Sequence, residues 1–374
     1  MNPKENFLAV LRHQTPQWIP WVPLIDPANT PIFVPTNLRD NWEALSISLY
    51  LYEELGCDLL LGDWLVLNKF KTAKFMSTSN GNETTKTFII NGKKLSSKSK
   101  VAINGLQKSH AITEYMVKTY DDLLAYEELL EDQIQELNPE EFIRLSKGIG
   151  DKGIVTPMGP TSPIMDMVLN IAGGENFVYL LMDYPEEMER ILDKIHIINL
   201  RYYELLLNSG LDFEVVRSHE DFDTLLISHN MFKKYVFPCL KDYVTLCHDA
   251  GKLFMMHSCG HVKDLVSLIP DTGIDAHHYL TSPPVGNIEC EDVIHLWKGK
   301  VTVMAAVDPL LQAVGTEEDV RNDVVKLLKA GKPGDSLIVM SALKPDIPEA
   351  NIRIVQKTMA EYGRYPVIIE QEGI

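Results

Sequence analysis

Short apolar runs alternate with helical patterns along the last two thirds of the chain. Each run is too short for a typical helix and is bounded by turn residues, which favours a buried strand. The runs occupy residues 153–158, 213–217, 252–257, 274–278, 301–305 and 336–340. From residue 213 onward their starts lie 22 to 39 residues apart, which is the length of a strand with its following helix. The pattern therefore predicts repeated strand–helix units and a parallel sheet.

Helical periodicity is clearest between Asp183 and Asn208, where a helix start signal precedes apolar residues at helical spacing. The apolar positions are Met188, Ile191, Leu192, Ile195, Ile198, Tyr202 and Leu205. Three further helices are predicted over residues 230–250, 316–330 and 349–362, each followed directly by glycine. These helices occupy the intervals between the predicted strands.

Two weaker apolar runs, at residues 18–23 and 58–62, bring the number of predicted strands to eight. Eight parallel strands with intervening helices are typical of a closed (β/α)8 (TIM) barrel. The alternative is an open, doubly wound sheet, which commonly carries a glycine-rich phosphate loop after a strand. No such loop follows any of the predicted strands, so we interpret residues 1–374 as a single barrel domain.

One segment departs from the strand–helix pattern. Asn91-Gly92 separates two strand-like runs within residues 86–97, and this dipeptide is a strong signal for a two-residue β-hairpin turn. We interpret residues 68–102 as a hairpin excursion outside the barrel.

Charge and cysteine content narrow the class of protein. Lys and Arg total 35 against 52 Asp and Glu, so the net charge of −17 argues against electrostatic binding of nucleic acid or anionic membranes. The chain has no apolar stretch long enough to span a bilayer, and its polar start does not resemble a signal peptide. Five scattered cysteines do not form a disulfide framework. These features favour a cytoplasmic protein.

Polar side chains gather after the central predicted strands, at the end of a barrel where active sites form. The richest segments are Arg217–Asp221 after the fourth strand and His257–His261 after the fifth. His278 and Tyr279 follow the sixth strand, and Asp63 and Trp64 follow the second. The sequence therefore predicts a site at the carboxyl ends of these strands.

His257 and Cys259 are two residues apart, so an extended backbone directs both side chains to the same side. Imidazole and thiolate are both preferred zinc ligands. The alternative interpretation is a buried structural cysteine beside a helix-capping histidine. Glu220 and Asp221 are candidates for metal ligands or acid–base groups, or they are charges at a helix start.

Several segments together resemble the uroporphyrinogen decarboxylase superfamily, specifically its corrinoid-dependent methyltransferase branch. The most specific is Met256-His-Ser-Cys-Gly260, preceded by Ala250-Gly-Lys. The other segments are 5–20, 114–123, 226–241, 307–309 and 315–320. The resemblance covers nearly the whole chain and implies a (β/α)8 barrel.

In that branch, zinc is held by a His-x-Cys pair after the fifth strand and by a cysteine after the eighth. His257 and Cys259 match the pair, whereas the position of the second cysteine falls on Pro345. Either another group completes the site or no metal binds. The candidates for that group are Glu220 as first choice, His278 as second, and Asp346.

The resemblance implies a metal-assisted methyltransferase that moves a methyl group between a corrinoid protein and a small methyl ether, amine or thiol. Glu220 or Asp221 would then serve as ligand or acid–base group. The substrate pocket is expected to involve Asp63, Trp64, Arg217 and His278.

Two alternatives stay open. A porphyrinogen-type decarboxylase needs arginines for a substrate rich in carboxylates, but residues 24–31, after the first strand, contain Asp26 and no arginine. A catalytically inactive barrel that serves as a binding protein is favoured by the missing cysteine.

Overall fold

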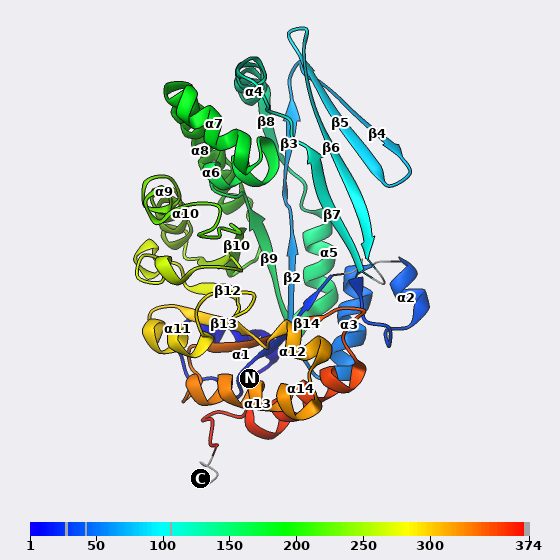
Figure 1. Ribbon diagram of the computed structural model, residues 1–374. Coiled ribbons are helices and arrows are strands. Elements are labelled where there is room, and N and C mark those ends of the chain that lie inside the picture. The colour runs from blue at the N-terminus through cyan, green and yellow to red at the C-terminus, as the bar shows by residue number, and fades with distance from the viewer. Residues whose placement is uncertain (27–28, 42, 105–106, 370–374) are drawn as a thin grey trace.

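Eight parallel strands form a nearly closed barrel surrounded by helices, which confirms the predicted (β/α)8 fold (Figure 1). The computed structural model describes residues 1–26, 29–41, 43–104 and 107–369. The strand order is β1-β14-β13-β12-β11-β10-β9-β2, and the two end strands, β1 and β2, also contact each other. The strands are β1 (Trp21–Ile25), β2 (Leu59–Asp63), β9 (Gly153–Gly159), β10 (Val215–His219), β11 (Leu253–His257), β12 (Ala276–Leu280), β13 (Thr302–Ala306) and β14 (Leu337–Leu343).

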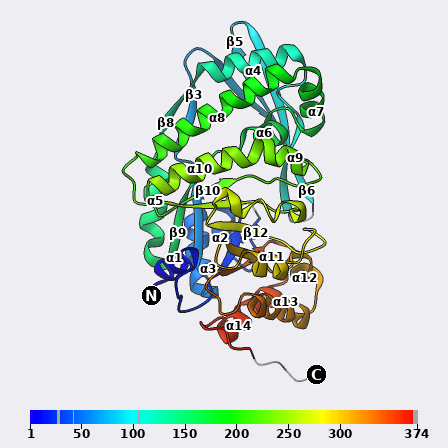
Figure 2. The same cartoon turned by 90° about the vertical axis from the view of Figure 1, so that its left-hand side faces the viewer.

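The helices surround the barrel, and the long helices α8 and α10 lie side by side along one flank (Figure 2). The larger helices are α1 (Pro3–Leu11), α3 (Ala44–Leu55), α5 (Glu140–Ile149), α7 (Gly174–Asp183), α8 (Pro185–Leu207), α10 (Phe237–Asp249), α11 (Cys290–Trp297), α13 (Glu317–Ala330) and α14 (Glu349–Tyr362). Short helices are α2 (Thr36–Asn41), α6 (Pro163–Asp166), α9 (His229–Met231) and α12 (Pro309–Val314). Within the part of the chain that the structure describes, no helix is long and apolar enough to cross a membrane.

All four predicted helices are present, with one change at a boundary. Asp183, expected to begin the first of them, instead ends α7, and α8 begins at Pro185 without a side-chain cap. Proline fits the first helical position because its fixed φ suits the helix and its missing N–H is not needed there. The second predicted helix, over residues 230–250, is not one regular α-helix: it starts in α9, continues through a π-helical turn at Phe232–Val236, and then becomes α10.

Alternating side chains divide the core into two clusters. Val215, Leu60 and Met255 belong to the cluster inside the barrel, whereas Val216 and Phe254 belong to the cluster between strands and helices. This alternation is the period of two expected for strands that are buried on both faces. It also means that Arg217 and His219, two and four residues after Val215, follow its inward direction.

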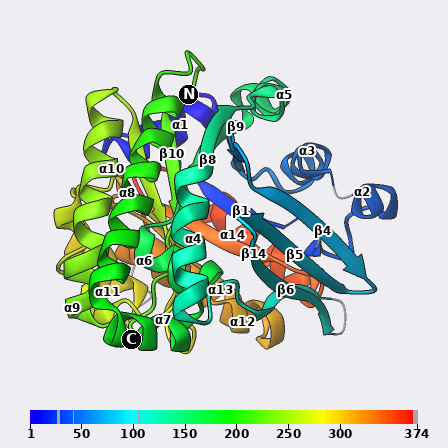
Figure 3. The same ribbon diagram turned by 90° about the horizontal axis from the view of Figure 1, so that it is seen from above.

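The excursion after β2 is larger than the predicted hairpin. It begins with β3 (Val66–Phe70), which pairs antiparallel with β8 (Gln133–Leu137). Between them lie a four-stranded antiparallel sheet and the helix α4 (Tyr120–Asp132). The sheet consists of β4 (Lys74–Asn80), β5 (Glu83–Ile90), β6 (Lys93–Asn104) and β7 (Gln107–Glu114). Figure 3 shows the sheet projecting to one side of the barrel, away from α8 and α10.

The hairpin turn itself is confirmed. Asn91 and Gly92 connect β5 and β6 with φ values of 49° and 81°, the left-handed conformation at both positions that such a turn requires. The expected limits of 68–102 missed β7 and β8. Side chains of β4 are exposed throughout, so this part of the sheet carries little of the apolar pattern on which a sequence prediction depends.

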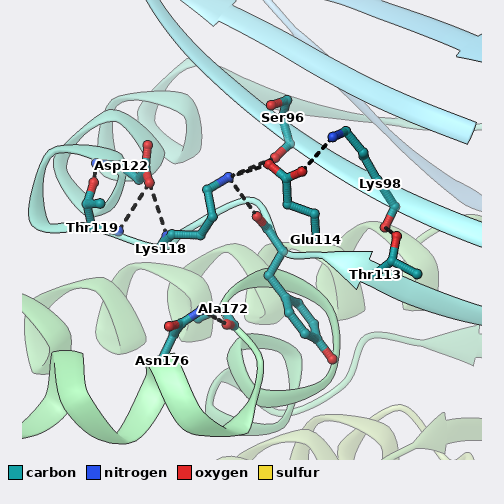
Figure 4. Close-up of polar contacts among 10 residues, drawn as sticks. Ser96, Lys98, Thr113, Glu114, Lys118, Thr119, Asp122, Ala172 and Asn176 are labelled. Carbon is teal, nitrogen blue, oxygen red and sulfur yellow. Dashed lines mark hydrogen bonds and ion pairs between the residues drawn. The ribbon is translucent and has the colours of Figure 1, made fainter.

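Ion pairs join the sheet to the start of α4 (Figure 4). Lys98 on β6 and Lys118 before α4 both contact the carboxylate of Glu114 on β7, at 2.8 and 3.2 Å. Thr119 and Asp122 form a reciprocal capping box at the first turn of α4. The position of α4 is therefore set both by the sheet and by its own cap.

Candidate functional site

Three histidines lie side by side at the carboxyl ends of adjacent strands. His219 on β10 is in register with His257 on β11, and His257 is in register with His278 on β12. Side chains of register partners in a parallel sheet point to the same side. The barrel therefore places three imidazoles together at its mouth.

Asp221 lies between two of these histidines. His219 Nε2 is 2.5 Å from one of its carboxylate oxygens and His257 Nε2 is 3.1 Å from the other. Burial alone would raise the pKa of Asp221, but the hydrogen bonds from the two histidines hold that pKa well below its usual range. The carboxylate is thus an anion over the ordinary pH range.

The backbone at Asp221 has an unusual conformation, with φ of 44°. Residues other than glycine seldom adopt positive φ, and such residues concentrate at functional sites. The N–H of Glu220 donates to the carbonyl of His257 at 2.9 Å, which connects this turn to β11. The turn brings the carboxylate of Asp221 back toward the barrel mouth.

His219, Asp221 and His257 form a group that could hold a metal ion. One ligand atom from each lies within 4.8 Å of the other two. Two imidazoles and one carboxylate are a known donor set for catalytic zinc, with a further position left for water or substrate. The residues present therefore fit the metal that the sequence predicts.

His278 supports His257 from the next strand. The Nδ1 atoms of the two rings are 2.6 Å apart, so one ring donates a hydrogen bond to the other. Burial lowers the pKa of both histidines, which favours the neutral form needed for metal binding. A metal-binding histidine usually has such a partner on its second nitrogen. His278 is therefore placed to orient His257.

Cys259 lies beside this group. Its thiol donates to Asp221 at 3.9 Å, and burial raises the pKa of the thiol to about 11. His257 and Cys259, the predicted pair, thus both contact the carboxylate of Asp221. Cys259 is not part of the group of three ligand atoms itself.

Glu220, the first choice for the third ligand, points elsewhere. Its carboxylate accepts hydrogen bonds from the backbone N–H of Ser162 at 3.0 and 3.3 Å, and burial raises its pKa to about 7. Asp346 is exposed beyond β14. Within the described part of the chain, the carboxylate that the structure brings to His257 is that of Asp221.

The sequence interpretation did not single out His219 as a ligand. A signal was present, because His219 lies two residues after Arg217 and four after the inward-facing Val215. Its alignment with His257 depends on the register of β10 and β11, which no local pattern specifies.

A cavity of about 510 Å³ opens beside the histidine–aspartate group and includes His219 and Asp221 in its wall. Trp64, half exposed, lines it, as does Tyr202. Its polar wall is formed by Asn68, Gln133, Gln135, Thr161, Asn170 and Asn199. The excursion contributes to this wall through β3, α4 and β8, so it completes a pocket at the barrel mouth.

Asp63 on β2 and Arg217 on β10, both predicted pocket residues, do not line this cavity. Asp63 has one carboxylate oxygen that is buried without a hydrogen-bond partner among the described residues, and burial raises its pKa. Arg217 lies inside the barrel, where burial lowers the pKa of its guanidinium to about 10. Both side chains are therefore at the predicted end of the barrel.

The sequence of residues 154–362 matches the family model described as uroporphyrinogen decarboxylase (URO-D). The chain belongs to the uroporphyrinogen decarboxylase family. The match runs from β9 to the end of α14 and includes every side chain of the histidine–aspartate group. Membership of the URO-D family confirms the resemblance to this superfamily inferred from the sequence.

The fold of this URO-D family member is shared by a solved structure. A methyltransferase from Methanosarcina mazei has 12% sequence identity and a TM-score of 0.62, over 97% of this chain and 99% of its own. A B12-independent methionine synthase from Shewanella sp. W3-18-1 has 12% identity and a TM-score of 0.48, over 92% and 96% of the two chains. Comparison with curated protein sequences finds no match.

Proposed function

We propose that the protein is a methyltransferase that moves a methyl group between a small substrate and a corrinoid protein. The observation that carries the proposal is the group of His219, Asp221 and His257 at the mouth of a URO-D barrel, beside a cavity. The fold shared with the Methanosarcina mazei methyltransferase supports it. We also propose a cytoplasmic location, which the sparse cysteines favour.

His219, Asp221 and His257 would hold zinc, with Cys259 as a possible fourth ligand. Bound zinc would supply Lewis acidity to the heteroatom that carries or receives the methyl group. Without metal, Asp221 holds the two imidazoles together through hydrogen bonds to their Nε2 atoms, and zinc would replace these bonds while His278 keeps the ring of His257 oriented through Nδ1. Trp64 and Tyr202 contribute apolar wall to the cavity that would exclude water.

Glu220 would act in this scheme through Ser162. Its carboxylate holds the backbone at the start of α6, next to Thr161, whose hydroxyl donates to the carbonyl of His219 at 3.0 Å. Glu220 is therefore a positioning residue for β10 in this proposal.

The metal content of the purified protein tests the site. We expect wild-type protein prepared without chelator to carry zinc, and a His257→Ala, Cys259→Ala double variant to lose it. Glu220→Gln serves as the control, because Glu220 bonds to Ser162 instead of the metal group, and should retain zinc. Equal metal in wild type and the double variant would show that zinc is not held here.

The reaction is tested by mixing the protein with a methylated corrinoid protein and recording the visible spectrum. Demethylation of cobalt in the presence of a methyl acceptor supports the methyltransferase. Conversion of uroporphyrinogen at an enzyme-like rate would instead support the decarboxylase, which we disfavour because Asp26 follows β1 where cationic groups are needed. Pro27 and Ala28 of that loop lie outside the described residues.

A further inference from the structure

We infer that Arg217 binds a carboxylate group of the small substrate, so that the substrate is a methylated or methyl-accepting acid. The inference rests on the proposed function, because it deepens the description of the same site. It concerns the guanidinium of Arg217, a positive charge inside the barrel that has no role in the proposed metal site.

Arg217 has no carboxylate partner within the described residues. Its one hydrogen bond to a described residue runs from Nε to the sulfur of Met158, at 3.2 Å, and thioether sulfur is a weak acceptor. A guanidinium has five N–H donors in a planar fork, so most of them stay available. The side chain is half-buried, so part of it remains open to solvent. An arginine with these free N–H donors can bind an anion from outside the protein.

A cation inside a barrel lined by apolar residues is costly unless an anion accompanies it. The charged groups on adjoining strands do not compensate Arg217: Asp221 is engaged by two histidines, and Glu220 by Ser162. Asp63 follows Gly62 on β2 and makes no ion pair with Arg217 among the described residues, and the other titratable neighbours of Arg217 are the histidines of the site. Carboxylate oxygens match the fork of a guanidinium in a bidentate geometry.

Gly62 on β2 makes room for the guanidinium. A Cβ atom built at Gly62 would lie 2.2 Å from Arg217 Nη2 and 2.8 Å from Met158 Sδ. Any larger residue at position 62 would therefore displace the head of Arg217. The close approach of the guanidinium to the β2 backbone shows that this orientation depends on a glycine two strands away from β10 in the sheet.

The distance between Arg217 and the metal group limits the substrate. Arg217 and His219 are two residues apart on β10 and point to the same side, so their Cα atoms are separated by about 7 Å. A carboxylate on Arg217 would place a heteroatom a few bonds away beside His219, Asp221 and His257. Arg217 is also the deeper of the two along β10, so the methylated end would face the open mouth and a corrinoid partner.

The experiment measures binding of matched acids and amides by ligand-observed NMR titration. The probes are methoxyacetate, methylthioacetate and N,N-dimethylglycine, each compared with its primary amide. We expect wild-type protein to bind at least one acid at least about tenfold more tightly than its amide, because hydrogen bonds to charged groups are the stronger ones. Equal affinity for acid and amide across all three pairs, or no binding of any acid, overturns the inference.

Three variants assign the effect to Arg217. Arg217→Met removes the charge with little change in volume, and Gly62→Ala keeps the charge but displaces the guanidinium; both should abolish the preference for acid. Arg321→Met is the control, because Arg321 pairs with Glu361 on the helical surface. This variant should keep the preference for acid. Retention of the preference in Arg217→Met would overturn the inference.

Folding and metal controls keep the result interpretable. Because Arg217→Met removes an uncompensated charge, its melting temperature should equal or exceed that of wild type; a large decrease would instead indicate a structural role and contradict the inference. His257→Ala should retain the acid preference, which excludes binding of the acid to zinc. Acid binding through Arg217 without any methyl transfer would reject the proposed function alone, whereas methyl transfer without an acid preference would reject only the carboxylate site.

Discussion

Single side chains decide what the barrel mouth can bind, and His219 is the clearest case. It supplies one of the three donors in the candidate metal group, and its ring contacts Asp221 directly. Replacing His219 with alanine leaves one imidazole and one carboxylate, which is too few ligands for a stable catalytic zinc site. We expect zinc affinity to fall by at least about 100-fold, because loss of an outer-shell partner alone costs 10- to 100-fold.

The control for that prediction is His229→Ala. His229 lies at the start of α9 and bonds to the carbonyl of Asp264, away from the metal group. Competition with a zinc-binding dye measures both affinities. A similar loss in both variants would contradict the assignment of His219.

Asp58 gives a pH-dependent prediction at a second residue. It is buried near the start of β2, accepts hydrogen bonds from Trp18 and the backbone of Trp21, and has a pKa that burial raises to about 7. The folded state therefore keeps a proton that the unfolded chain releases near pH 4. Stability supplied by this proton is present at low pH and is lost as the pH rises toward and through 7.

Asp58→Asn removes this titration while keeping an oxygen acceptor. We expect the free energy of unfolding of the variant, relative to wild type, to rise between pH 4 and pH 8 by up to roughly 4 kcal/mol, at about 1.4 kcal/mol for each pKa unit. Urea denaturation at several pH values measures the difference. A difference that is independent of pH would show that Asp58 is ionised in the folded protein.

At the scale of elements, α4 connects the excursion to the pocket. Tyr126 and Leu130 of this helix line the cavity at the barrel mouth, and its first turn is held by the capping box of Thr119 and Asp122 (Figure 4). Arg190 and Lys194 of α8 pair with Glu127 on its outer face. The helix is thus attached at its start and along its length.

Thr119→Ala removes the capping oxygen and should destabilise the protein by about 1 kcal/mol. Thr119→Ser keeps the oxygen and should remain within a few tenths of a kcal/mol of wild type. Chemical denaturation of the two variants makes the comparison. Equal destabilisation by serine and alanine would show that the methyl group of Thr119, and not its hydroxyl, stabilises this end of α4.

For the whole molecule, the excursion and the barrel share one hydrophobic core. Leu95 and Leu129 from the excursion belong to the same buried cluster as Val155 and Val216 from the barrel. The interpretation of the chain as a single domain stays a prediction, and this continuity supports it. Domains that share a core unfold together, because neither part can expose its face without the other.

We therefore expect one calorimetric unfolding transition, with equal calorimetric and van't Hoff enthalpies. Limited proteolysis provides a second measurement: cuts in the turns of the four-stranded sheet should not release a stable barrel. Two resolved transitions, or a protease-resistant fragment that lacks residues 66–137, would show that the excursion is an independent unit.

The elements of this protein were largely predictable from local sequence. All eight barrel strands, the four predicted helices and the Asn91–Gly92 turn follow from apolar periodicity and from the conformations that glycine, proline and asparagine favour. The strands that carry the site were also identified, because polar residues cluster at their carboxyl ends. The full excursion was missed, since an exposed antiparallel sheet does not need a regular apolar pattern.

The geometry of the site was decided only by tertiary structure. Glu220 and Asp221 are adjacent and chemically alike, yet the positive φ at Asp221 directs one carboxylate to His257 while Ser162 engages the other. The register between β10 and β11 places His219 beside His257, and Gly62 on β2, two strands from β10 in the sheet, makes room for Arg217. Local sequence specifies the direction of a side chain along its own strand, whereas contacts between strands depend on register and turn conformation, which form only when the barrel closes.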